Sequence, residues 1–301
     1  MECPMKTYRT TTVPVTGGQL QVGLWGPEDT SAPTVLLVHG VTASHKAWGR
    51  VAQALPGVRL IAPDLRGRGR SNQLPGPYGM PAHAVDLAAV VRQLAGGPVA
   101  VAGHSMGAFA SLVFADNYRD LVSSLLLVDG GLPLQVPPGL DDDQIVQAVL
   151  GPAAERLAME FESVEAYKEF WAPHPAFASN WNELVDEYLE YDLHGTAPHL
   201  RPATSYEAVA QDTAELHRGA SLLAALQQLH HPAVFLRSPK GLLGAEPGLY
   251  EAEYVKEWGQ RLPELAIEEV PGTNHYTIVM DSPGDQIVAG HLRAMLCAVR
   301  T

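Results

Sequence analysis

A serine between two glycines lies where the sequence changes from a strand pattern to a helix pattern. The segment GHSMG, residues 103–107, follows the apolar residues 99–102 and precedes a helix-forming stretch. Such a turn between a strand and a helix lifts the serine hydroxyl above the sheet edge. The free N–H groups at the helix start favour negative charge nearby. We therefore predict that Ser105 is a nucleophile.

A serine hydroxyl is a poor nucleophile unless a neighbouring base takes its proton. Among the 12 histidines, His275 lies in a loop directly after the last predicted strand, residues 266–270. That position brings it to the same edge of the sheet as Ser105, whereas alternation along the strand predicts that His104 points away from the nucleophile. His275 is the candidate general base.

Two carboxylates are candidates for orienting the imidazole. Asp129 directly follows the predicted strand 124–128, and Glu246 lies in a glycine-rich loop after the next strand, 233–236. A short aspartate at a strand end is held more rigidly than a glutamate in such a loop, so we favour Asp129. Glu246 remains the alternative.

Backbone N–H groups next to the serine could stabilise an oxyanion. Gly40 follows the predicted strand 35–38 and lets the chain turn, so that the N–H of Val41 can face the nucleophile. Met106 directly follows Ser105 and supplies the second N–H. We predict that these two groups form an oxyanion hole.

Short apolar runs that alternate with amphipathic helix patterns indicate the scaffold for these residues. Two alternating segments, 11–15 and 19–25, predict a hairpin of edge strands around Gly17-Gly18. The remaining runs read as buried strands of a parallel sheet with helices on both faces. They cover residues 35–38, 58–61, 99–102, 124–128, 233–236 and 266–270.

The strand pattern stops between about residues 131 and 230, where helix formers and aromatic residues dominate. We predict a helical cap at 132–230 inserted into an α/β core formed by 1–131 and 231–301. The aromatic side chains of the cap could line a substrate pocket, but at helical spacing they more often pack the cap onto the core. A roofed pocket would favour a medium-sized hydrophobic ester or a lactone.

Composition describes an ordinary globular protein with an acidic surface. The formal net charge of −13 argues against nucleic-acid or anionic-membrane partners. The two cysteines, Cys3 and Cys297, lie near opposite ends and form no disulfide framework. The sequence lacks an apolar run long enough for a signal peptide or a membrane span. We expect a cytoplasmic protein whose partner is a small molecule.

These residues together resemble the α/β-hydrolase family from about Thr11 to the C-terminus. The resemblance rests on His39-Gly40, the loop DLRGRGRS at 64–71, the GHSMG turn and His275. The chain order of serine, acid and histidine also matches that family. It implies an α/β-hydrolase fold with a helical cap, a Ser-His-Asp triad and no cofactor or metal.

One departure from the family pattern concerns the acid. Many members carry it in a Gly-x-x-Asp turn after the strand that corresponds to 233–236, where this chain reads RSPKG. Some branches, including some lactone hydrolases and polyketide-synthase thioesterase domains, place it one strand earlier, as Asp129 would be. A serine nucleophile also argues against haloalkane dehalogenases and epoxide hydrolases, which use an aspartate.

The resemblance implies hydrolysis of a carboxylic ester through an acyl-enzyme. The same triad also serves lactone hydrolases, thioesterases and carbon–carbon bond hydrolases, which remain alternatives. A ligand receptor with slow turnover is a further alternative from a different functional class.

Overall fold

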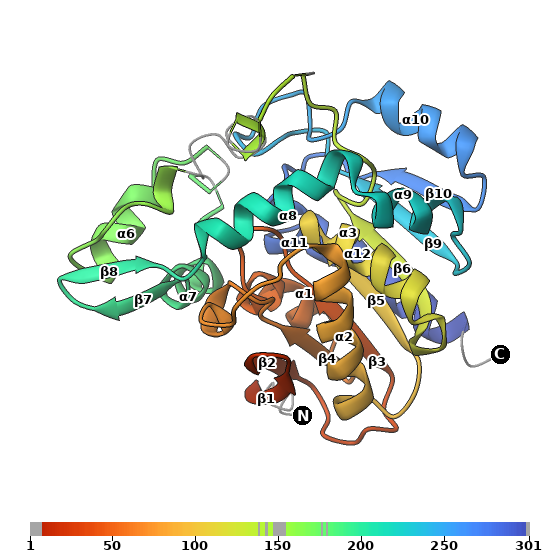
Figure 1. The fold of residues 1–301 in the computed structure, drawn as a ribbon, viewed down its shortest axis with the longest axis horizontal. Coiled ribbons are helices and arrows are strands. Elements are labelled where there is room, and N and C mark those ends of the chain that lie inside the picture. The colour runs from red at the N-terminus through yellow and green to blue at the C-terminus, as the bar shows by residue number, and fades with distance from the viewer. Residues whose placement is uncertain are drawn as a thin grey trace.

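An eight-stranded sheet forms the centre of the molecule (Figure 1). The computed structural model describes residues 8–137, 139–141, 144–146, 155–175, 177–178 and 180–298. The strand order is β1-β2-β4-β3-β5-β6-β9-β10, in which β1 and β2 run antiparallel to their neighbours and the other six are mutually parallel. The strands are β1 (Arg9–Val15), β2 (Gly18–Trp25), β3 (Thr34–Val38), β4 (Arg59–Pro63), β5 (Val99–His104), β6 (Val122–Val128), β9 (Ala233–Arg237) and β10 (Leu265–Glu269).

Helices cover both faces of the sheet. Helices α2, α3 and α9 pack together on one face, and α1 and α12 pack together on the other. The helices are α1 (Gly49–Ala54), α2 (Met80–Leu94), α3 (Met106–Asn117), α6 (Val164–Trp171), α7 (Glu183–Tyr191), α8 (Tyr206–Arg218), α9 (Ala220–Gln227), α10 (Ala252–Arg261), α11 (Thr277–Met280) and α12 (Gly284–Ala298). Short 3₁₀ turns within the described residues are η1 (His45–Trp48), η2 (Gly69–Ser71) and η3 (Arg119–Leu121).

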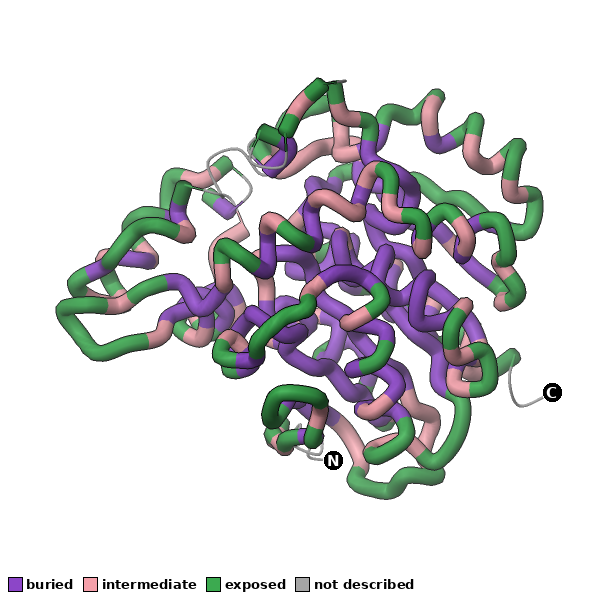
Figure 2. The backbone as a smooth tube through the Cα atoms, viewed as in Figure 1, coloured by how far each residue is buried: buried purple, intermediate pink, exposed green. Residues whose placement is uncertain are grey.

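Strand β5 shows how the sequence builds two hydrophobic cores. Successive side chains of a strand point to opposite faces. Val99 and Val101 therefore pack against the α2/α3 side, whereas Ala100 and Ala102 pack against the α1/α12 side. Every residue of β5 is buried, and Figure 2 shows buried residues concentrated in the sheet and the helices that flank it. A strand buried on both faces explains the continuous apolar run that predicted it.

The predicted fold class, an α/β hydrolase with a mostly parallel sheet covered on both faces, is confirmed. Each of the eight predicted strands is present, with bounds shifted by one or two residues. One detail was wrong, because β2 pairs with both β1 and β4 and is not an edge strand. Within the described residues, β1 and β10 are the two edges of the sheet.

The region predicted as a helical cap, 132–230, differs from that expectation in two places. A two-stranded sheet, β7 (Leu193–Thr196) with β8 (His199–Pro202), contacts α7 through β7, and Figure 1 shows this sheet on the left, away from the C-terminus. Helix α9 packs against α3 on the core sheet. The structure thus groups α9 with the core, although the predicted cap included it.

No helix within the described residues is both long enough and apolar enough to cross a lipid bilayer.

Candidate active site

Ser105 occupies the sharp turn between β5 and α3. Its φ of 54° lies in the left-handed region that a residue with a side chain rarely adopts. Two hydrogen bonds hold this backbone, from Ser105 N–H to the Val128 carbonyl at 2.9 Å and from Ala108 N–H to the Ser105 carbonyl at 2.9 Å. The strained turn is therefore fixed by β6 on one side and by α3 on the other.

The two flanking glycines are required by close approach of the backbone. A Cβ on Gly103 would lie 2.3 Å from the carbonyl oxygen of Gly107, and a Cβ on Gly107 would lie 2.1 Å from that of Val38. Neither position has room for any side chain. Close approach of α3 to β5 at Gly103, and of α3 to the end of β3 at Gly107, therefore requires glycine at both positions.

His275 and Asp129 meet at the same edge of the sheet. His275 follows β10 in the loop 270–276, and Asp129 directly follows β6. The Nδ1–H of His275 donates to Asp129 Oδ2 at 2.6 Å, with both side chains buried. The backbone N–H of Ser238 donates to the other carboxylate oxygen, Oδ1, at 3.0 Å. Both oxygens of Asp129 are therefore engaged, which fixes the imidazole orientation.

Asp129 shares an unusual backbone feature with Ser105. Among the described residues, these two are the non-glycine positions with positive φ, and the φ of Asp129 is 45°. Its N–H donates to the Leu236 carbonyl at 2.7 Å, which ties the turn to β9. Backbone strain of this kind persists where the surrounding structure holds it, and it concentrates at functional sites.

Glu246, the alternative acid, lies elsewhere. It is exposed in the loop between β9 and α10, and the Nδ1 atom that it would have to engage is bonded to Asp129. The structure brings together Ser105, Asp129 and His275 at one sheet edge and leaves Glu246 outside.

His104, set aside on the sequence, supports the loop that carries His275. Its Nε2–H donates to the backbone carbonyl of His275 at 2.8 Å, and the two rings lie 4.8 Å apart between centroids. Burial, reinforced by the neighbouring imidazole of His275, holds the pKa of His104 well below its ordinary value. His104 therefore stays neutral, so it adds no positive charge next to His275.

The turn after β3 lies directly against the serine. A Cβ on Gly40 would be 3.2 Å from Cβ of Ser105, so this glycine lets the turn approach. Val41 follows it and lines the pocket together with Met106. Met106 is the first residue of α3, where helix N–H groups have no intrahelical acceptor. The backbone at both predicted oxyanion positions thus borders Ser105.

Arg68, which the sequence analysis did not single out, contacts both of those positions. The guanidinium is fully buried, donates from Nε to the Val41 carbonyl at 2.9 Å, and lies 3.7 Å from the Met106 sulfur through Nη2. It also pairs with Asp212 of α8, at 2.5 Å between Nη1 and Oδ2. A charged side chain with such contacts fixes the backbone turn beside Ser105.

Asp212 connects three segments through one buried carboxylate. It bonds His83 Nε2 of α2 at 3.0 Å and accepts from the N–H of Gly79 at 2.6 Å, in addition to Arg68. Burial opposes ionisation of this carboxyl, but the charges of Arg68 and His83 outweigh it and lower its pKa to about 2. Helix α8 is therefore linked electrostatically to the turn that borders the serine.

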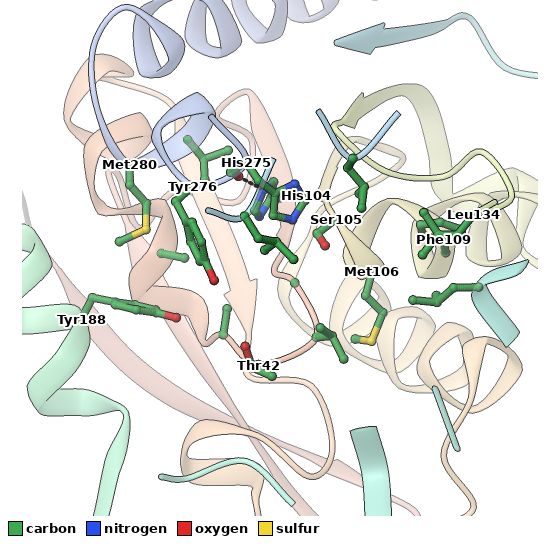
Figure 3. Close-up of a pocket in the computed structure, with 18 residues that line it drawn as sticks. Thr42, His104, Ser105, Met106, Phe109, Leu134, Tyr188, His275, Tyr276 and Met280 are labelled. Atoms are coloured by element: carbon green, nitrogen blue, oxygen red, sulfur yellow. Dashed lines mark hydrogen bonds between the residues drawn. The ribbon is translucent and has the colours of Figure 1, made fainter. Parts of the chain in front are cut away.

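A mostly apolar pocket opens beside Ser105 (Figure 3). Its described lining contains no lysine, arginine, aspartate or glutamate. Phe109, Leu134 and Leu216 form part of an apolar wall, and Tyr188 and Tyr276 add phenol rings. Other aromatic residues of the predicted cap pack against one another, as Trp171 does with Tyr167, Phe170 and Phe177 at ring distances of 5.3–6.4 Å. Among these side chains, packing within the cap is therefore commoner than lining the pocket.

Comparison with known proteins agrees with this architecture. Residues 33–162 match the family model described as the alpha/beta hydrolase fold. The 2-(acetamidomethylene)succinate hydrolase of Mesorhizobium japonicum is 28% identical over 253 residues, which cover 83% of this chain and 84% of that protein. The lipase LipV of Mycobacterium tuberculosis is 37% identical over 132 residues, covering 44% of this chain and about half, 48%, of the lipase.

Solved structures share the fold over nearly the full length of the chain. A crystal structure of E-2-(acetamidomethylene)succinate hydrolase superposes with a TM-score of 0.76 at 23% identity and covers 96% of this chain and 99% of that one. A thioesterase domain from the curacin biosynthetic pathway gives a TM-score of 0.73 at 19% identity and covers 97% and 99%. The chain thus shares its overall fold with these solved structures.

Proposed function

The chain belongs to the α/β-hydrolase superfamily, and on that premise we propose that it cleaves carboxylic esters through an acyl-enzyme. The observation that carries the proposal is the bond between His275 and Asp129 at the sheet edge where Ser105 occupies its strained turn. Serine, base and orienting carboxylate are the minimum set for nucleophilic ester cleavage at neutral pH.

Each residue of this set has one role in the proposed reaction. Ser105 Oγ attacks the ester carbonyl while Nε2 of His275 accepts its proton, and the electron pair of the carbonyl moves onto oxygen. When that pair returns, the bond to the alcohol oxygen breaks and the imidazolium gives its proton to the leaving group. Water then repeats the sequence on the acyl-enzyme, releasing the acid and free Ser105. Asp129 holds the Nδ1–H tautomer throughout and stabilises the imidazolium.

The developing oxyanion is proposed to bind the N–H groups of Val41 and Met106. The Gly40 turn lies against Ser105, and Met106 begins the helix whose dipole favours negative charge there. Arg68 acts as a positioning residue for this backbone, because it holds the Val41 carbonyl and contacts the Met106 side chain.

The apolar lining of the pocket favours a substrate that is small to medium in size, uncharged and hydrophobic. The named relative acts on a succinate, which carries two carboxylates, but the described lining here has no lysine or arginine to pair with them. An unpaired carboxylate in an apolar pocket is costly. We therefore propose that uncharged esters are preferred over dicarboxylates.

A chain-length series of p-nitrophenyl esters tests this proposal, run beside lactones, a thioester and the monoester and diester of a dicarboxylic acid. Wild-type protein should hydrolyse medium-chain neutral esters and the uncharged diester. It should reject the monoester, whose free carboxylate would have no cation to pair with, and Ser105→Ala should be inactive on all of these compounds. If wild-type protein hydrolysed only the thioester, or only lactones, Ser105, His275 and Asp129 would be assigned to thioester or lactone hydrolysis instead. Inactivity of wild-type protein on every compound would contradict the proposal.

A further inference from the structure

Two phenol hydroxyls point into the pocket without a hydrogen-bond partner among the described residues. Tyr188 comes from α7 and is 5% exposed, and Tyr276 follows His275 directly. Figure 3 shows both hydroxyls directed into the pocket. Because both residues line the pocket, an acceptor atom of a bound ligand can take a hydrogen bond from each hydroxyl.

The rings that carry these hydroxyls are held in place. Tyr276 packs against Phe177 and Trp171, with ring centroids 4.9 Å and 6.5 Å apart. Tyr188 lies in α7 and belongs to the same buried apolar cluster as Tyr167, Trp171 and Phe177. Because both rings are packed, the two hydroxyls keep their directions before any substrate enters, which lowers the entropic cost of binding.

Both hydroxyls are neutral donors. Burial raises the pKa of Tyr276 to about 12, and burial also raises the pKa of Tyr188. Arg156, whose charge acts on both phenols, is 1% exposed and bonded to Asp192 at 2.6 Å. Arg156 is therefore already paired with a carboxylate, and it is not among the described residues that line the pocket, so it offers no direct partner for a substrate carboxylate. A neutral acceptor suits this site better than an anion.

The position of Tyr276 assigns the hydroxyls to one side of the scissile bond. His275 must protonate the leaving alcohol, so that part of the ester lies beside its imidazole. The ring of Tyr276 is 6.0 Å from that imidazole between centroids. Figure 3 shows Phe109 and Leu134 on the other side of Ser105, where an apolar acyl chain would lie.

We propose that Tyr188 and Tyr276 form a two-donor subsite for a neutral oxygen acceptor in the alcohol portion of the ester. This inference rests on the proposed ester hydrolysis. The substrate class is an ester of an apolar acid with an alcohol that carries an ether, hydroxyl or carbonyl oxygen. An alcohol that is a simple alkyl chain leaves both hydroxyls unpaired.

Two esters of equal length test the subsite. The two esters are 2-methoxyethyl butanoate and butyl butanoate, and the acid that each releases measures its hydrolysis. The ratio of their kcat/KM values is divided by the ratio of their alkaline hydrolysis rates, which removes the difference in intrinsic reactivity. Wild-type protein should prefer the methoxyethyl ester by about tenfold, the value expected for one to two net hydrogen bonds. Tyr188→Phe and Tyr276→Phe should each reduce that preference, and the double variant should bring it close to parity.

A matched control removes a phenol hydroxyl outside the pocket. Tyr118 lies beyond the C-terminal end of α3 and packs against Phe114, so Tyr118→Phe should keep the wild-type preference. A wild-type ratio near one would overturn the subsite while leaving ester hydrolysis intact, and so would a preference that both tyrosine variants retain. Failure of wild-type protein to cleave either ester would overturn the proposed function and the subsite together.

Discussion

Nδ1 of His275 lies 2.6 Å from Oδ2 of Asp129, although the two residues are 146 positions apart in the chain. Strands β6 and β10 end at the same edge of the sheet, separated only by β9, and this topology makes the contact. The other oxygen of Asp129 accepts from the backbone of Ser238, which directly follows β9. The loop after β9, where many relatives of this fold keep their acid, thus serves here to hold an acid from the preceding strand.

Replacing Asp129 should damage catalysis far more than replacing Glu246. In Asp129→Asn the carboxylate no longer accepts from Nδ1–H, so the imidazole loses its tautomer and its charge stabilisation. We expect kcat to fall on the order of 10³–10⁴-fold, whereas Glu246→Gln should retain wild-type kcat. Steady-state kinetics on p-nitrophenyl butanoate give both values, and circular dichroism checks that each variant is folded. Equal losses in both variants would contradict the assignment.

Arg68 should affect kcat more than KM. Lysine keeps the charge but lacks the Nε–H that bonds the Val41 carbonyl, so in Arg68→Lys the oxyanion turn loses its support. We expect kcat to fall by at least about tenfold with a smaller change in KM. Arg66→Lys is the matched control, because Arg66 is also buried and paired, with Asp86, but does not contact Val41 or Met106. Similar kcat losses in the two variants would show a general structural effect instead.

Two glycine substitutions should change stability in opposite directions. In Gly107→Ala the new Cβ would lie 2.1 Å from the Val38 carbonyl oxygen, so we expect a loss above ~4 kcal/mol or failure to fold. Gly290 lies on the exposed side of α12, and a methyl group at this position would meet no described atom within 4 Å, so Gly290→Ala should stabilise the helix by ~0.5–1 kcal/mol. Urea unfolding measures both. A well-folded Gly107→Ala protein would show that the turn has room.

Acid should destabilise the fold before its carboxylates titrate. His39 is fully buried, and its Nε2 accepts from Leu65 N–H at 2.9 Å while its Nδ1–H donates to the Gly40 carbonyl. Burial lowers its pKa from 6.5 to about 4. Between these values the unfolded chain binds a proton that the native protein does not, so stability is complete above pH 6.5 and falls as the pH drops toward 4.

The size of this effect follows from the shift, and a variant isolates it. One pKa unit corresponds to ~1.4 kcal/mol, so His39 contributes roughly 3 kcal/mol of the loss. His104, whose pKa is also lowered, acts in the same direction. Urea unfolding between about pH 7 and about pH 4 measures the slope. His39→Gln keeps an acceptor for Leu65 but does not titrate, so its slope should be shallower than that of wild-type protein. An unchanged slope would assign the loss to other groups.

The sequence predicted those parts of the site that depend on local pattern. Periodicity located all eight strands of the central sheet, and the glycine spacing around Ser105 indicated the turn. The close contact at Gly103 is with the nearby Gly107, whereas the one at Gly107 is with Val38 of β3. His275 and Asp129 were chosen by the rule that strand ends share an edge. That rule works without any knowledge of side-chain contacts.

The sequence analysis did not predict features that depend on contacts between residues far apart in the chain. Arg68 and Asp212 are 144 positions apart, and nothing in either local pattern indicates a buried pair. Strands β7 and β8 are short and largely exposed, so they lack the apolar run that reveals core strands. That Tyr188 and Tyr276 line the same pocket likewise depends on how the predicted cap packs against the loop after β10.

Covalent labelling tests the central claim, that Ser105 is a nucleophile activated by His275, most directly. Diethyl p-nitrophenyl phosphate reacts with an activated serine to give a stable diethylphosphoryl adduct and p-nitrophenolate. We predict one equivalent of p-nitrophenolate per protein, an adduct that mass spectrometry locates on Ser105, complete loss of esterase activity, and no adduct in Ser105→Ala. An adduct on another residue, or ester turnover that continues in fully labelled protein, would contradict the account.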